Sequence, residues 1–290
     1  PAWNRLSTTA RLSAKIKHPN VAEVYDVGLD EDRFSVYLAM EMCPGENLRD
    51  RVLHKGPLTI EQSVAVGRQV LQGLAAAHAK NVVHGSLSPK YILLDAQRKD
   101  DDTTPRLNVK LVGFGLSDWE QKSERGDDPA VWGTAGFAAP EVLAAKQADF
   151  SSDYYAVAVC MFFAMTGQLP WEAGVLDIDE ARRWYDHRVR WAFENEKGGQ
   201  GWGDFFQIAL APEPSDRFDS AVAMIDALKH AAAGKNREGS QISQRREKFG
   251  HFRLVRMLAR GGMGELHLAT TDLDTGEAQA VALKTLRQDL

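Results

Sequence analysis

Two runs near the end of the chain hold residue types that bind phosphate groups in proteins. The run Leu258–Leu266 contains three glycines, and Lys284 ends the apolar run Val281–Lys284. A glycine-rich turn between two strands lets backbone N–H groups approach phosphate oxygens, and a lysine on the next strand can meet their negative charge. A glycine string alone is a weak signal of nucleotide binding, and its pairing with Lys284 strengthens that signal modestly.

Further motifs stand earlier in the chain, and together they match the motifs of one known family. Glu41 and Met42 follow a strand-like apolar run, as a hinge segment would. The longer motifs are Val83–Leu94 (VHGSLSPKYILL), Val109–Gly115 (VKLVGFG), Gly133–Glu141 (GTAGFAAPE) and Pro214–Arg217 (PSDR). With the glycine run and Lys284, these motifs cover nearly the whole chain and resemble those of the bacterial, eukaryotic-like Ser/Thr protein kinases.

The resemblance locates the positions at which an active kinase does its chemistry. In the family, an aspartate of the catalytic loop is the base. An asparagine of the same loop and a second aspartate, in the metal-binding motif, hold magnesium. This sequence has Ser86, Tyr91 and Gly113 at those three positions, and Thr9 where a glutamate would pair with Lys284. Serine is no base near neutral pH without an activator, and tyrosine and glycine offer no carboxylate to a hard cation. We therefore expect a pseudokinase rather than an enzyme, with no catalytic residue and no metal site.

Other residues of these loops give no obvious replacement. Asp95 and Asp118 are the nearest acids in the sequence, and Asp100–Asp102 is typical of the exposed tip of a hairpin. We expect all of them to be solvated loop acids rather than ligands. Ser88 stands where the family has a loop lysine, and Gly85 replaces the arginine that captures a phosphate on the activation segment.

The residues that build the family's scaffold are retained. Glu141 and Arg217 match a buried ion pair that ties the activation segment to the helical lobe, and breaking such a pair typically costs a few kcal/mol. Asp153 matches a helix residue that hydrogen-bonds the backbone of the catalytic loop. His84 and Phe114 match packing positions.

The resemblance also outlines a possible nucleotide pocket. Its residues would be Gly261, Gly264, Leu266, Ala282, Lys284, Glu41, Met42 and Leu93. No cofactor is required in this interpretation, and ATP, if it binds, would bind without magnesium. The main functional hypothesis is a protein-interaction, scaffold or allosteric module in signalling. The alternatives are a nucleotide-sensing switch without phosphoryl transfer and a residual or atypical Ser/Thr kinase.

The elements that must position these motifs can be read from the hydrophobic pattern. Two strand-like runs, Val21–Tyr25 and Phe34–Leu38, precede a long helix that begins at a capping box of Thr59 and Gln62. Residues 154–166 are apolar on all sides, which predicts a buried helix ended by Gly167 and Pro170. A last helix, capped by Asp219 or Ser220, would carry Val222, Ile225 and Leu228 on one face.

The resemblance implies an α+β, bilobal protein-kinase-like fold, with a small antiparallel β lobe and a large helical lobe. The order of the family's motifs along this chain is rotated. If residues 1–3 are placed after Lys284–Leu290, the sequence continues from the lysine strand into the regulatory helix as it does in the family. We expect one circularly permuted domain, cut between the lysine strand and the regulatory helix. Its parts would be the regulatory helix and later small-lobe strands (1–40), the hinge and helical lobe (41–230), a linker (231–248) and the glycine-loop hairpin with the lysine strand (249–290). The rival interpretation is a slice through tandem kinase domains.

Composition sets the broad class. The 290 residues are 44% hydrophobic and 26% charged with a net charge of −5, which is typical of a soluble globular protein and unlike a nucleic-acid binder. Cys43 and Cys160 lie far apart, which favours a reducing compartment. The longest apolar run, Tyr154–Met165, is too short for a membrane span, and no signal peptide opens the chain. We expect a cytoplasmic, monomeric protein with a protein partner.

Overall fold

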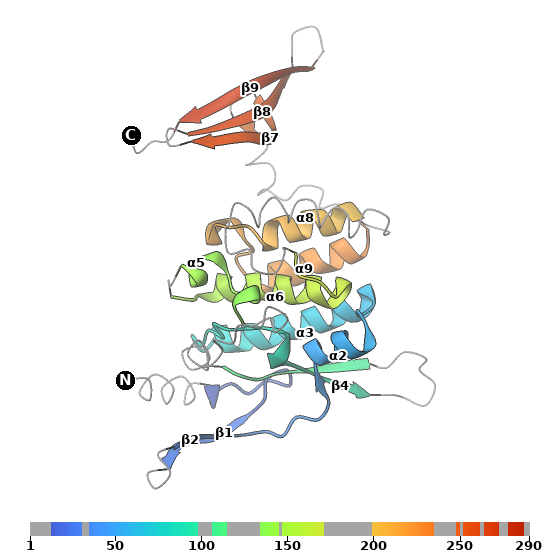
Figure 1. Ribbon diagram of the computed structural model, residues 1–290, viewed down its shortest axis with the longest axis vertical. Helices are drawn as coiled ribbons and strands as arrows, with labels where there is room; N and C mark the ends of the chain where they lie inside the picture. The colour runs from blue at the N-terminus through green and yellow to red at the C-terminus, as the bar shows by residue number, and fades with distance from the viewer. Residues whose placement is uncertain are drawn as a thin grey trace. The chain divides into compact units, whose positions relative to one another are not determined.

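The fold is that of a computed structural model. It describes residues 13–30, 35–97, 106–114, 134–144, 147–170, 199–234, 248–249, 252–261, 264–272 and 278–286. The chain divides into two compact units, Pro1–Asn236 and Arg237–Leu290, and each is described by itself. Figure 1 labels their helices and strands.

The first unit contains two small antiparallel sheets. The first sheet pairs β1 (Val24–Asp30) with β2 (Ser35–Met40), and the second has the order β3 (Glu46–Asn47), β4 (Ile92–Gln97), β5 (Arg106–Leu111). The predicted strand at 21–25 begins later, at Val24, because Val21 and Ala22 pair with Leu111 instead. Val21 forms a parallel bridge to Leu111, and the Ala22 N–H donates to the Leu111 carbonyl at 2.8 Å.

The helices of this unit lie beside the three-stranded sheet in successive layers (Figure 1). They are α2 (Leu48–Lys55), α3 (Ile60–His78), α5 (Pro140–Leu143), α6 (Phe150–Thr166), α8 (Gly199–Ala209) and α9 (Ala221–Ala232), with single 3₁₀ turns η1 (Pro89–Tyr91), η2 (Thr134–Phe137) and η3 (Pro214–Asp216). Helix α3 packs against β5, α6 and α9. None of the described helices is both long and apolar enough to cross a membrane.

The ends of the two longest helices follow from their capping residues. The Thr59 side chain accepts from the Gln62 N–H at 3.1 Å, and the Gln62 side chain accepts from the Thr59 N–H at 3.2 Å. The predicted capping box at α3 is therefore confirmed. Helix α6 begins at Phe150, before the predicted residue 154, because Asp149 and Ser152 form a second capping box. Of the predicted buried run 154–166, residues 154–164 are buried and the last two are half-buried, and Gly167 ends the helix with a φ of +73°.

Helix α9 differs in detail from the prediction. Ser220 is its N-cap, as expected, since its side chain accepts from the Ala223 N–H at 3.2 Å. The predicted apolar face is confirmed at Leu228, which is buried, and wrong at Val222, which is 68% exposed; Met224 lies on the buried face instead. Ala231 is buried within this helix, so the first residues of the predicted linker are helical.

The second unit is a four-stranded antiparallel sheet. Its strands are β6 (Lys248–Phe249), β7 (Phe252–Gly261), β8 (Gly264–Asp272) and β9 (Ala278–Leu286), in that order. Together the two units give the mixed α+β content of the predicted protein-kinase-like fold.

Candidate active site

A single carboxylate holds the backbone of the segment that resembles a catalytic loop. Asp153, in the first turn of α6, is 1% exposed. Its Oδ2 accepts from the His84 N–H at 2.8 Å, and its Oδ1 accepts from the Gly85 N–H at 2.9 Å. The same carboxylate lies 2.8 Å from Nε2 of His78, whose ring stacks on Phe150 at 4.2 Å. The predicted role of Asp153 is confirmed: it fixes the loop to α6 and, through His78, to α3.

His84 packs in the core of this loop. Its Nε2 donates to the Val112 carbonyl at 3.0 Å, and its ring lies 4.7 Å from Phe114 and 5.4 Å from Tyr91 between centroids. Burial lowers the pKa of His84, which outweighs the opposing effects of the Asp153 charge and the backbone hydrogen bonds. A buried, neutral imidazole tied to a backbone carbonyl agrees with the predicted packing role.

The loop carries three buried hydroxyl groups. The Ser86 Oγ, Ser88 Oγ and Tyr91 OH each expose less than 1 Å² and have no hydrogen-bond partner among the described residues. Ser88 is 3% exposed and Tyr91 is 7% exposed. Lys90 Nζ lies 5.0 Å from the centroid of the Tyr91 ring. Hydroxyls can donate to phosphate oxygens, but none of the three is a strong base near neutral pH.

Tyr91 and Gly113 meet where the two loops come together. The Val112 N–H donates to the Tyr91 carbonyl at 3.1 Å, which fixes the loops side by side. Gly113 has a φ of +88°, and a Cβ atom added there would lie 2.5 Å from Cδ1 of the Tyr91 ring. Only glycine avoids both the strained backbone and the steric overlap.

The predicted hinge segment forms an ion pair that the sequence did not reveal. Lys110 Nζ, on β5, lies 2.8 Å from Oε2 of Glu41, and the Glu41 N–H donates to the Glu23 carbonyl at 2.8 Å. The hydrogen bond from Lys110 lowers the pKa of Glu41. The alternation of β5 indicates that Lys110 is available for such a contact. Leu107, Val109 and Leu111 point inward, and Lys110 therefore lies on the opposite face of the strand.

The eight residues of the predicted nucleotide pocket fall in both units. In the first unit Glu41 is part of the ion pair, Met42 is 93% exposed and Leu93 is half-buried on β4. In the second unit the register pairs Gly261 with Gly264, Leu266 with Lys284, and Ala282 with Leu268. The glycine run therefore closes a hairpin, and Lys284 lies on the next strand directly across from Leu266.

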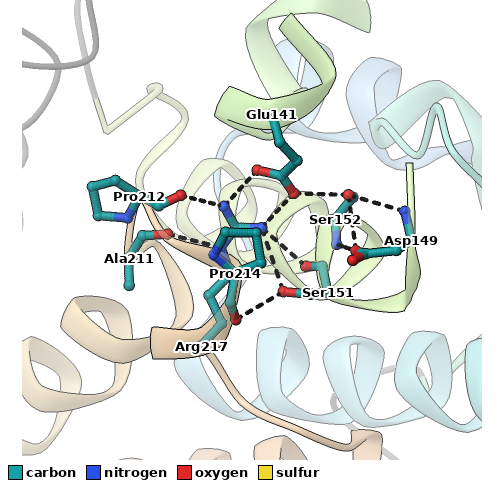
Figure 2. Close-up of polar contacts among 8 residues, drawn as sticks. All are labelled: Glu141, Asp149, Ser151, Ser152, Ala211, Pro212, Pro214 and Arg217. Carbon is teal, nitrogen blue, oxygen red and sulfur yellow. Dashed lines mark hydrogen bonds and ion pairs between the residues drawn. The ribbon is translucent and has the colours of Figure 1, made fainter. Parts of the chain in front are cut away.

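Glu141 and Arg217 form the predicted buried ion pair (Figure 2). Arg217 Nη1 and Nη2 each lie 2.7 Å from one carboxylate oxygen of Glu141, a bidentate arrangement. Arg217 also donates to the carbonyls of Ala211 and Pro212, at 2.7 and 2.8 Å, and its side chain is 0% exposed.

The surroundings of this pair set the protonation state of Glu141. Ser152 Oγ donates to Glu141 at 2.8 Å, and the Arg217 guanidinium lies 4.7 Å from the Tyr155 ring centroid. Burial alone raises the pKa of Glu141, but the hydrogen bonds from Arg217, Ser152 and the backbone, together with the Arg217 charge, bring it below the ordinary value. Glu141 is therefore ionised at neutral pH, as the salt bridge requires.

The remaining candidate acids do not gather into a metal site in the described part of the chain. Asp95 is half-buried within β4 rather than in a solvated loop, so that expectation was wrong for it, and its carboxylate accepts from the Gln97 side chain at 3.3 Å. Among the described residues, no group of three His, Cys, Asp or Glu side chains is placed to hold a metal ion. Thr9, Asp118 and Asp100–Asp102 lie outside the described residues.

Comparison with known proteins identifies the family. The protein kinase domain family matches residues 4–230, so the chain belongs to it. The chain is 32% identical over 221 residues to the serine/threonine-protein kinase PknL of Mycobacterium tuberculosis, covering 76% of this chain and 52% of the relative. It is 33% identical over 175 residues to the serine/threonine-protein kinase pkn3 of Myxococcus xanthus, covering 58% of this chain and 30% of the relative.

The solved structures support the same fold. The crystal structure of the M. tuberculosis PknI kinase domain matches with a TM-score of 0.58 at 21% identity, covering 80% of this chain and 79% of that chain. The chain spans about a third to a half of the length of PknL and pkn3. The kinase-like fold and the bacterial Ser/Thr kinase homology are therefore confirmed.

These comparisons correct one prediction. From the three altered chemical positions we expected a chain that is not an enzyme. That expectation is wrong on the comparisons, since the relatives are named serine/threonine protein kinases and the chain belongs to their enzyme family. The altered residues describe how the site differs from the family pattern; they are no demonstration of inactivity.

Magnesium, which this family uses, does not fit the residues present. The two liganding positions hold Tyr91 and Gly113, and neither carries a carboxylate or amide oxygen on its side chain. A longer side chain at position 113 would overlap the Tyr91 ring, as the 2.5 Å approach shows. These two positions therefore offer a divalent cation no suitable side-chain ligand.

Proposed function

We propose that this chain is an atypical serine/threonine protein kinase domain that transfers a phosphoryl group slowly to a serine or threonine of a protein. The observation that carries the proposal is the anchoring of the catalytic loop on Asp153, by hydrogen bonds of 2.8 and 2.9 Å to the His84 and Gly85 N–H groups. Phosphoryl transfer depends mainly on positioning and charge stabilisation, and this loop keeps its position.

The altered base position sets the expected rate. Ser86 replaces the aspartate that accepts the proton of the substrate hydroxyl, and loss of a general base costs about 10²–10⁴-fold. Protein kinases typically turn over at about 1–100 s⁻¹, so loss of the base alone sets an upper range of roughly 10⁻⁴ to 1 s⁻¹, and the missing side-chain metal ligands lower the rate further. Such a rate is measurable over hours with labelled ATP.

The test compares matched variants at Ser86. Ser86→Asp supplies a carboxylate base, and Ser86→Asn supplies a side chain of the same size as aspartate without one. We expect S86D to raise phosphate incorporation by about 10²-fold or more and S86N to leave it unchanged. Lys284→Ala gives the background. If neither the natural chain nor S86D incorporates phosphate above that background, the kinase proposal is wrong.

A second candidate function is a nucleotide-sensing switch, which binds ATP without transferring phosphate. The observation that favours it is the closure of the metal position by the Tyr91 ring over Gly113. In a thermal-shift titration, ATP would then raise the melting temperature while no phosphate appears on any protein substrate. Transfer of phosphate by the same preparation would exclude the switch as the sole function.

We also propose that the C-terminal sheet completes the small β lobe within the same chain, as a circularly permuted kinase domain. Three side chains of the β1–β2 sheet support this: Tyr25, Leu29 and Tyr37 are 63%, 45% and 47% exposed. We expect a monomer, and its protein partner would be the phosphoryl acceptor.

A further inference from the structure

The ring of Tyr91 occupies the space into which any side chain at position 113 would extend. A Cβ atom on Gly113 would lie 2.5 Å from Cδ1, 2.6 Å from Cε1 and 3.1 Å from Cγ of that ring. Carbon atoms in contact normally stand about 3.5–4.0 Å apart, so either the ring or the loop would have to move. The backbone adds a second barrier, because the φ of Gly113 is +88°.

The Tyr91 ring is held in place and cannot simply swing aside. It is 7% exposed and lies 5.4 Å from the His84 ring, which is itself fixed by its bond to the Val112 carbonyl. The overlapping atoms, Cδ1, Cε1 and Cγ, form one edge of the ring, so rotation of the hydroxyl hydrogen gives no relief. The tyrosine and the glycine are therefore sterically coupled.

We infer that Tyr91 determines the metal specificity of this loop: its ring fills the space that a carboxylate side chain at position 113 would need, and so it excludes a divalent cation. The Ser86 Oγ, Ser88 Oγ and Tyr91 OH are themselves buried, so they offer no exposed oxygen that could replace the missing carboxylates. Lys90 Nζ, 5.0 Å from the Tyr91 ring centroid, places a positive charge beside the loop. This inference rests on the proposed function in one respect: the choice of ATP as the nucleotide in the test.

The first test measures ATP binding and metal binding separately, on the full chain. We expect the dissociation constant for ATP to be the same in magnesium and in EDTA. In the double variant Y91N/G113D, which restores both liganding residues, magnesium should tighten ATP binding by about 5- to 150-fold, the usual range for coupled ligands. Mn²⁺ alone, followed by electron paramagnetic resonance, should bind the double variant and neither the natural chain nor Gly113→Asp.

The outcomes of this test separate the inference from the proposed function. If ATP binds to no variant, the proposed function fails, and Mn²⁺ binding still decides the inference. Binding of Mn²⁺ to the natural chain, a collapse of ATP affinity in EDTA, or Mn²⁺ binding gained by Gly113→Asp alone would each overturn the inference.

A second test measures the steric coupling without any ligand, in case the charged variants fail to fold. Gly113→Ala is introduced into the natural chain and into the Tyr91→Ala chain. The strained φ penalises alanine in both, but the ring overlap exists only in the first. We expect Gly113→Ala to lower the melting temperature more when Tyr91 is present. Equal losses in the two backgrounds would contradict the coupling.

Discussion

Replacing Arg217 with methionine should remove a large part of the stability of the helical unit. Methionine keeps the length and apolar stem of the side chain but leaves the Glu141 carboxylate, 9% exposed, without its bidentate partner. Ser152 Oγ would remain a donor to Glu141, at 2.8 Å. The carbonyls of Ala211 and Pro212 would also lose a donor each.

The magnitude follows from this isolated charge. Breaking a buried ion pair by removing one partner costs about 3–5 kcal/mol, against a total stability of about 5–15 kcal/mol for a typical domain. The double variant E141L/R217M removes both charges, and it should lose less than R217M alone because no buried charge remains. The two single losses should therefore not add.

Urea unfolding followed by circular dichroism measures these free energies. Lys229→Met is the matched control, since Lys229 lies 3.2 Å from Asp226 in a pair whose side chains are 59% and 52% exposed. An exposed pair contributes about 0–1 kcal/mol. A loss for Arg217→Met within about 1 kcal/mol of the Lys229→Met loss would refute the reasoning, as would a double variant less stable than R217M.

Three further predictions concern acid stability, the C-terminal strands and the loop anchor. The folded pKa of Glu141 is lowered below its ordinary value of 4.5, so its contribution to the free energy of unfolding is present above that pH and lost as the pH falls through the folded pKa. Urea unfolding at a series of pH values should therefore show that acid lowers the stability of Glu141→Gln less than that of the natural chain. Equal losses of stability in acid would contradict this. Deleting residues 250–290 should give aggregated or loosely folded protein, while light scattering of the full chain should report a 32.1 kDa monomer; a soluble, cooperatively unfolding truncated chain would favour tandem domains. Asp153→Asn leaves one side-chain oxygen for the two backbone donors, the His84 and Gly85 N–H groups. The free energy of unfolding should therefore fall by about 1–3 kcal/mol, and an unchanged value would show that other contacts hold the loop.

Local signals in the sequence were sufficient for much of the scaffold. The capping box of Thr59 and Gln62 and the all-apolar run of α6 depend on neighbouring residues only, so they could be read directly. The ion pair of Glu141 and Arg217 links residues far apart in the chain, and only the family motifs pointed to it.

Features that depend on packing between distant segments could not be predicted in this way. The start of α6 was misplaced because Asp149 lies outside the apolar run that marked the helix. The ion pair of Glu41 with Lys110 joins a strand end to another strand, and no local pattern names that partner. The overlap between Tyr91 and Gly113 needs the three-dimensional approach of two loops, although both residues had been identified as altered.

The way Asp153 holds the catalytic loop has a consequence for how this segment can change over evolutionary time. The carboxylate grips backbone N–H groups, those of His84 and Gly85, and main-chain donors are present whatever side chain follows. Substitutions at Ser86 and Ser88 would therefore leave these two hydrogen bonds in place, while the burial of both hydroxyls limits the size of the side chain that fits. Laboratory evolution of the loop could therefore test small side chains at these two positions while the backbone stays attached to α6.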